Sequence, residues 1–188
     1  MLNFAHRRCA ACLLDPFRFA QRGVTLIELM IAIIIVSILL AIALPNFNAW
    51  VQNAQIRTAT ESIQNGLQLA RAEAVRRNEA VNFILGSGSG WTVSTVAVPG
   101  TPIQSRVSSE GSVNVTVTVT PAGATTATFN TLGRLANPAA APTQIDLDVP
   151  VSILPANQSK ELRINITSGG QIRSCDPNVT ASDDPRKC

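Results

Sequence analysis

Residues 23–44 read GVTLIELMIAIIIVSILLAIAL, and this stretch decides the fold. The 21 residues from 24 to 44 are apolar or small except for Thr25, Glu28 and Ser37. As a helix the run is roughly 31 Å long, close to the ~30 Å hydrocarbon core of a bilayer. The sequence therefore predicts a single transmembrane helical segment over residues 24–44, and nothing after residue 50 is apolar enough for a second one.

Charge is distributed unevenly on the two sides of this segment. The first 23 residues carry four arginines and one aspartate, so they hold the whole net charge of +3. Residues 24–188 are neutral, with eleven basic and eleven acidic side chains, so the charge balance of the folded part does not indicate nucleic-acid binding. A basic segment before an apolar span predicts a cytoplasmic N-terminus, with the C-terminal bulk across the membrane.

The four cysteines form two pairs along the chain. Cys9 and Cys12 have a spacing compatible with redox or zinc chemistry, but zinc needs four ligands and His6 is the other candidate nearby. Cys175 and Cys188 lie beyond the span, where an oxidising compartment favours a disulfide; two free thiols of a cytosolic protein are the alternative. Such a loop of 14 residues contributes about 3 kcal/mol through chain entropy.

A carboxylate stands near the start of the apolar run. An ionisable residue inside a membrane helix costs about 2.5–3.5 kcal/mol, so we expect Glu28 to have a partner. Cleavage after Gly23 would create one, the α-amine of Val24. In a stack of identical helices, Glu28 of one subunit can then meet the amine of its neighbour and fix the axial register. The alternative is a glutamate that extends to the cytoplasmic interface.

The run Gly23–Met30 resembles the class III signal of type IV pilins and type II secretion pseudopilins. The resemblance implies that residues 1–23 are a leader, that a prepilin peptidase cuts after Gly23, and that the new N-terminus is methylated. Val24 stands where the family usually has Phe, and Pro45 falls where pilins commonly have a helix-kinking proline. The implied partners are other major and minor pilins or pseudopilins and an inner-membrane assembly platform.

An ordinary secretory signal is the rival reading of the same stretch. Residues 41–43 read Ala-Ile-Ala, which resembles a signal peptidase site after an apolar run. Ordinary apolar regions of signal peptides are shorter, about 7–15 residues, and carry no acid near their start, unlike this run with Glu28. A cleaved, secreted product is therefore the less favoured alternative to an inner-membrane, single-pass protein with a periplasmic head.

The helical pattern continues beyond Pro45. Apolar residues recur at steps of three and four, the stripe of an amphipathic helix, at Ile56, Ala59, Ile63, Leu67, Ala70 and Ala74. The pattern stops near Asn78, so we expect one helix over about residues 24–79 whose second half presents this stripe to the head. Residues 67–75 also resemble a segment of GspH/FimT-type pseudopilins. We interpret the arginines near its end as solvated charges rather than a basic patch: Arg71, Arg76 and Arg77.

Composition changes after residue 80, where Val, Thr, Ser, Gly and Pro dominate. This indicates a β-rich head over residues 80–188, with strands expected at 80–85, 91–98, 113–119, 144–149 and 161–167. Residues 86–90 are predicted to form a turn rather than a phosphate-binding loop, because they lack its lysine and spacing. The fold class is α+β: a long N-terminal helix packed against a small antiparallel head, the pilin fold that the resemblance implies.

Catalytic chemistry is not expected. Without the leader the chain has no histidine, and it has no tyrosine anywhere. We therefore expect no enzyme, no cofactor and no metal. A calcium ion at the C-terminal aspartates is the alternative, although their spacing is not that of an EF-hand loop: Asp176, Asp183 and Asp184.

The C-terminal residues 169–177 and 184–188 resemble those of FimT/FimU-type minor pilins. In FimT-like proteins of naturally transformable bacteria a G-R-x-R run contacts DNA, and here residues 170–173 read Gly-Gln-Ile-Arg. A disulfide would gather Arg173, Arg186 and Lys187, which could then touch phosphates. The resemblance implies a structural subunit of a type IV pilus or type II secretion pseudopilus; a DNA-binding minor pilin for natural transformation is the alternative, and a surface for a neighbouring subunit is the plainer role of the loop.

Overall fold

The computed structural model describes residues 23–98 and 101–188, with the backbone alone at residues 42–46. The predictions made for residues 1–22, including those for Cys9 and Cys12, lie outside the described residues. The chain divides between Ala41 and Ile42 into two compact units, and each is described by itself.

The first unit contains the start of helix α1 (Leu26–Arg77). Its large apolar side chains from Val24 to Leu40 are 52–78% exposed and point in all directions around the helix. The hydroxyl of Ser37 donates to the carbonyl oxygen of Ile33 at 2.7 Å, so the helix itself satisfies this polar group. Among the described residues, no helix combines the length and apolarity that crossing a membrane requires. The span over residues 24–44 stays a prediction.

In the second unit α1 packs on the head through the stripe that the sequence predicts. All six stripe residues have no exposed surface: Ile56, Ala59, Ile63, Leu67, Ala70 and Ala74. The helix ends at Arg77 because Asn78 adopts a left-handed conformation, with φ of 53°, and the amide of Glu79 donates to the carbonyl oxygen of Ala74 at 3.3 Å.

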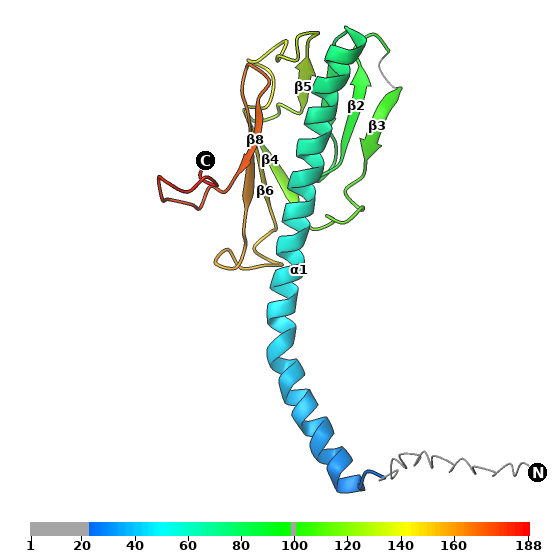
Figure 1. Ribbon diagram of the computed structural model, residues 1–188, viewed down its shortest axis with the longest axis vertical. Coiled ribbons are helices and arrows are strands. Elements are labelled where there is room, and N and C mark those ends of the chain that lie inside the picture. The colour runs from blue at the N-terminus through cyan, green and yellow to red at the C-terminus, as the bar shows by residue number, and fades with distance from the viewer. Residues whose placement is uncertain (1–22, 99–100) are drawn as a thin grey trace, which may run out of the picture. The chain divides into compact units, whose positions relative to one another are not determined.

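The head contains two antiparallel sheets, which flank the second half of α1 (Figure 1). The first has the order β3-β2-β1-β5 and the second β4-β6-β7-β8. The strands are β1 (Val81–Leu85), β2 (Trp91–Thr95), β3 (Pro102–Arg106), β4 (Thr116–Thr120), β5 (Thr126–Phe129), β6 (Gln144–Asp148), β7 (Leu162–Ile166) and β8 (Ile172–Cys175). Buried side chains from both sheets and from α1 form one hydrophobic core.

The predicted turn between the first two strands is present. The amide of Gly86 donates to the carbonyl oxygen of Gly90 at 2.8 Å, and Gly88 has a φ of 59° that favours glycine. This turn sets the pairing of β1 with β2, in which Leu85 lies opposite Trp91. The pairing stacks Phe83 and Trp91, with ring centroids 5.9 Å apart, over the buried face of α1.

All five predicted strands are shorter in the structure, and two of them differ from the prediction at one end by three residues. The strand predicted at 113–119 starts only at Thr116, because residues 112–115 form a turn and Asn114 binds the helix. The backbone N–H of Asn114 donates to Gln55 Oε1 at 3.2 Å, and its side-chain Nδ2 donates to Gln52 Oε1 at 3.1 Å. The strand predicted at 91–98 ends at Thr95, whose hydroxyl accepts a hydrogen bond from the amide of Val98 at 3.2 Å. Strands β3, β5 and β8 were not predicted as strands.

Candidate functional site

Helix α1 begins with a side-chain cap. Thr25 precedes the helix, and its hydroxyl accepts a hydrogen bond from the amide of Glu28 at 3.3 Å, while its carbonyl accepts from the amide of Leu29 at 3.1 Å. Thr25 is therefore the N-cap residue. This role was not predicted from the sequence, although Thr-x-x-Glu before an apolar run is the spacing of a capping box. Gly23 and Val24 lie exposed just before the cap.

Glu28 lies in the first turn of α1, where a negative charge interacts favourably with the positive end of the helix dipole. In the part of the chain that the structure describes, its carboxylate makes no hydrogen bond or ion pair. The neighbouring positions on the helix are apolar and exposed: Ile27, Leu29, Met30 and Ile31. One acidic group thus stands among apolar side chains, so a partner in apolar surroundings would have to come from outside the described residues.

Pro45 lies inside α1, whose bounds continue on both sides of it. Proline lacks a backbone N–H, so it removes one hydrogen bond of the helix at this point. Its side chain belongs to residues 42–46, which are described by their backbone alone.

The predicted C-terminal disulfide is confirmed. Cys175, the last residue of β8, is bonded to Cys188, with their Cα atoms 5.0 Å apart. The backbone also joins the two ends of the closed loop. The amide of Asp176 donates to the carbonyl oxygen of Arg186 at 2.7 Å, and Asp176 and Lys187 form an isolated β-bridge. The segment after β8 therefore returns alongside itself.

The three basic residues predicted for this loop are brought together, and each of them has a partner within the loop. Arg173 donates from Nη2 to the carbonyl oxygens of Pro185 (2.6 Å) and Lys187 (3.3 Å). Lys187 Nζ donates to the carbonyl oxygen of Thr180 at 3.3 Å. Arg186 forms a two-point ion pair with Asp184, at 3.1 and 2.7 Å.

The ion pair with Arg186 lowers the pKa of Asp184. The side-chain hydrogen bonds from Arg186, and then its backbone amide, lower the pKa of Asp184 from 3.8 to about 2. A lowered pKa means that the pair contributes to the folded loop above about pH 4 and is lost as the pH falls towards 2. Sequence reasoning did not single out Asp184 in this role, although its place two residues before Arg186 allows it.

This gives a prediction for the titration of the loop. In a carboxyl-carbon NMR titration of the full-length protein, we expect Asp184 to have a midpoint near 2. In Arg186→Gln the midpoint should return towards 3.8, because the cation that stabilises the carboxylate is gone. An unchanged midpoint in that variant would show that the pair does not form in solution.

The hydrogen bonds of Arg173 give it a structural role in the loop that can be tested. In Arg173→Ala we expect faster amide exchange over residues 176–188, because two loop carbonyls lose their donor. Arg134→Ala is the matched control, since Arg134 is exposed on another loop and should leave that exchange unchanged. Unaltered exchange in Arg173→Ala would mean that the arginine does not hold the loop.

The three C-terminal aspartates are not gathered into a calcium site. Asp176 Oδ1 accepts from the amide of Asn178 at 2.9 Å, Asp183 accepts from Ser182, and Asp184 is paired with Arg186. Within residues 23–98 and 101–188, no three His, Cys, Asp or Glu side chains are placed to hold a metal ion.

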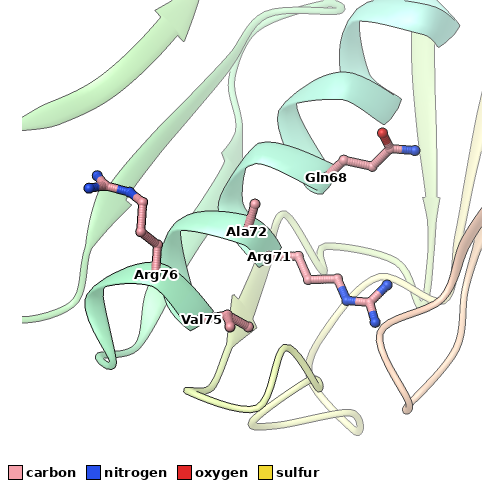
Figure 2. A pocket seen from close by; sticks show the side chains of 5 residues that line it. All are labelled: Gln68, Arg71, Ala72, Val75 and Arg76. Carbon is pink, nitrogen blue, oxygen red and sulfur yellow. The ribbon is translucent and has the colours of Figure 1, made fainter.

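Two of the arginines near the end of α1, Arg71 and Arg76, line a shallow hollow of about 500 Å³. Figure 2 shows Arg71 and Arg76 pointing away from each other, with Ala72 and Val75 between them. Arg76 and Arg77 both bind Glu73, and these hydrogen bonds lower the pKa of Glu73 to about 2. The three arginines therefore do not form one open basic patch.

A wider groove of about 650 Å³ lies between α1 and the second sheet. Trp50, Arg57 and Glu61 line it from the helix, and Lys160 and Arg186 line it from the head. Asn53 bridges its two sides: Nδ2 donates to the carbonyl oxygen of Gln158 at 2.9 Å, and Oδ1 accepts from the amide of Lys160 at 2.8 Å. Sequence reasoning could not find this role of Asn53, because its partners lie 105 and 107 residues away.

Comparison with known families matches this architecture in two parts. The family model described as Type II transport protein GspH matches residues 59–170, from the buried half of α1 through β7. This protein belongs to the GspH family. The model of the prokaryotic N-terminal methylation motif matches residues 18–44, the segment that contains the Thr25 cap and Glu28.

The fold of this GspH-family protein is also that of a solved pilin. It resembles the crystal structure of the type IV minor pilin FimU of Pseudomonas aeruginosa strain PAO1, with a TM-score of 0.50 and 19% identity, over 67% of this chain and 97% of that one. A second crystal form of FimU gives a TM-score of 0.47 and 19% identity, over 63% of this chain and 86% of that one. The GspH-family chain is thus a type IV pilin-like protein with the pilin fold.

Proposed function

We propose that this protein is a minor structural subunit of a type IV pilus-like fibre, either a type IV pilus or a type II secretion pseudopilus. The single observation that supports this most is the apolar first part of α1, which carries one acid and follows Gly23 within the methylation motif. A helix that exposes large apolar side chains on all sides needs lipid or other helices around it. The inner membrane supplies lipid before assembly, and a fibre core built from such helices supplies the neighbouring helices afterwards.

The proposed assembly starts with processing. A prepilin peptidase cleaves after Gly23 and the amine of Val24 is methylated, in keeping with the motif. Glu28 then pairs with the Val24 amine of a neighbouring subunit, and residues 31–44 pack in the apolar core of the fibre. Two opposite charges that meet in apolar surroundings cost far less than either alone, so the pair fixes the register of adjacent helices.

The proposed location follows from the same segment. Before assembly, residues 24–44 anchor the protein in the inner membrane, with the N-terminus in the cytoplasm and the head of residues 80–188 in the periplasm. The Cys175–Cys188 disulfide supports a periplasmic head, because disulfides persist in oxidising compartments. The partners are other pilins or pseudopilins, the prepilin peptidase and an inner-membrane assembly platform.

DNA binding through the C-terminal loop is the less favoured alternative. Arg173 and Lys187 donate to carbonyl oxygens of the loop, and Arg186 is paired with Asp184. Residues 24–188 have a net charge of zero, and Gln171 stands where the FimT-like run has its first arginine, so the chain offers phosphates little positive charge. We therefore interpret the loop as a rigid surface for contact with a neighbouring subunit.

Processing is tested by co-expression with a prepilin peptidase, followed by intact-mass analysis. The native chain should lose its first 23 residues, and Gly23→Val should retain them, because a branched side chain replaces the glycine at the cut. Ala20→Val, three residues upstream, is the matched control and should be processed normally. Cleavage of Gly23→Val at the same bond would contradict the assigned site.

A further inference from the structure

Two aromatic side chains near the start of the second unit do not pack in the core. Phe47 and Trp50 are 58% and 67% exposed, and their ring centroids lie 5.9 Å apart on one side of α1. By contrast Trp91, the other tryptophan of the sequence, is 4% exposed and donates from Nε1 to the hydroxyl of Ser62. An exposed, paired Phe and Trp is therefore a feature that the packing of the head does not explain.

The segment that joins β6 to β7 lies at the same place along α1 (Figure 1). Asn53, three residues after Trp50, holds this segment through Gln158 and Lys160. The segment exposes two more apolar side chains, Val151 at 72% and Ile153 at 46%. The helix and the segment that Asn53 holds thus each expose apolar side chains, and the segment also carries the exposed Lys160.

The chain itself relates this surface to the apolar run. Phe47 and Trp50 follow Leu44 by three and six residues, which is roughly 5 and 9 Å along a helix. Aromatic side chains with one apolar and one polar part gather at the boundary between lipid tails and water. A lysine near that boundary is attracted to anionic headgroups.

We propose that Phe47, Trp50 and the β6–β7 segment, with Val151 and Ile153, form a lipid-docking surface that seats the head on the periplasmic face of the inner membrane before assembly. The inference rests on the proposed function, since it requires residues 24–44 to be in the bilayer. Lipid is the occupant that the observations favour, because the surface starts three residues after the proposed span and combines aromatic, aliphatic and basic groups.

Tryptophan quenching in nanodiscs tests this docking. The protein cleaved after Gly23, with its whole helix and head, is reconstituted in nanodiscs that contain anionic lipid. The acyl chains of the lipid are either unlabelled or brominated. Trp50→Phe gives the signal of the buried Trp91 alone, and its subtraction from the native protein gives the signal of Trp50. We expect brominated lipid to quench Trp50 by about twofold or more, as for an interfacial tryptophan, and to leave Trp91 unchanged.

A matched pair of variants tests the β6–β7 segment. Val151→Asp should reduce the quenching of Trp50, because a carboxylate resists contact with the lipid boundary. Leu132→Asp is the control: Leu132 is 74% exposed, but its loop packs near Arg71 and Val75, far along the helix from Trp50, so quenching should stay at the native level.

The outcomes separate this inference from the proposed function. Co-elution of the protein with nanodiscs reports membrane anchoring independently of fluorescence. Co-elution without quenching of Trp50, or equal losses in Val151→Asp and Leu132→Asp, overturns the docking surface and leaves the anchor intact. Failure to co-elute overturns the anchor and the docking surface together.

Discussion

Glu28→Ala is expected to be processed normally and yet to be nearly absent from fibres. Without the carboxylate, the Val24 amine of the neighbouring subunit would lie unpaired in an apolar core. Removing one partner of a buried ion pair typically costs about 3–5 kcal/mol, which corresponds to at least about a 100-fold loss of incorporation. The measurement is quantitative immunoblotting of the subunit in sheared fibres, relative to its amount in the membrane.

Glu61→Ala is the matched control on the same helix. Glu61 forms an exposed ion pair with Arg57 at 3.4 Å, and both side chains are more than half exposed, so its loss should matter little. Fibre incorporation of Glu61→Ala should therefore equal that of the native chain. Normal incorporation of Glu28→Ala would remove the ion pair from the account and leave apolar packing as the whole basis of assembly.

Gly66→Val is expected to destabilise the head by about 3 kcal/mol, at the upper end of the usual cost of overpacking. Gly66 lies in the buried half of α1 beneath the aromatic pair. A Cβ atom at this position would stand 2.8 Å from Cε2 of Phe83 and 2.9 Å from Cδ2 of Trp91, and valine adds two further methyl groups. Trp91 has little room to move, because Ser62 binds its Nε1 at 2.8 Å.

The gain in helix propensity does not offset this clash. Glycine is about 1 kcal/mol less favourable than alanine inside a helix, and valine recovers only part of that difference. Asn65→Val is the matched control, because Asn65 is exposed and adjacent in the same helix. Thermal unfolding of the full-length protein in detergent should show a midpoint about 6–12 °C lower for Gly66→Val and little change for Asn65→Val. Equal midpoints would mean that the rings move aside freely.

The parts of the fold that follow from local periodicity could be predicted from the sequence. The stripe from Ile56 to Ala74 is buried as expected, because a helix against a sheet needs apolar residues every three to four positions. The predicted start of β4 was wrong for a physical reason. Val113 continues the sequence alternation, but it is 68% exposed because the contacts of Asn114 with α1 hold that stretch in a turn. Such contacts between distant residues leave no periodic signal.

Two of the three missed strands lack a periodic signal. Strands β3 and β8 lie at sheet edges, and the β3 pattern is mostly exposed, so neither shows the alternation of a half-buried strand. In the candidate site, the disulfide followed from compartment and spacing, whereas the bond of Asn53 to the β6–β7 segment depends on the tertiary fold. The structure brings Arg173, Arg186 and Lys187 together, but the sequence could not show which groups of the loop they bind.

Intact-mass analysis of the protein, from sheared fibres and separately from the inner membrane, tests the central claim most directly. The account predicts a chain that starts at methylated Val24, is two hydrogens lighter for the Cys175–Cys188 disulfide, and occurs in the fibres. The same processed chain in the membrane alone would assign it to a secretion pseudopilus or an initiation complex. A chain that starts after Ala43, or that keeps its leader in both fractions, would contradict the account.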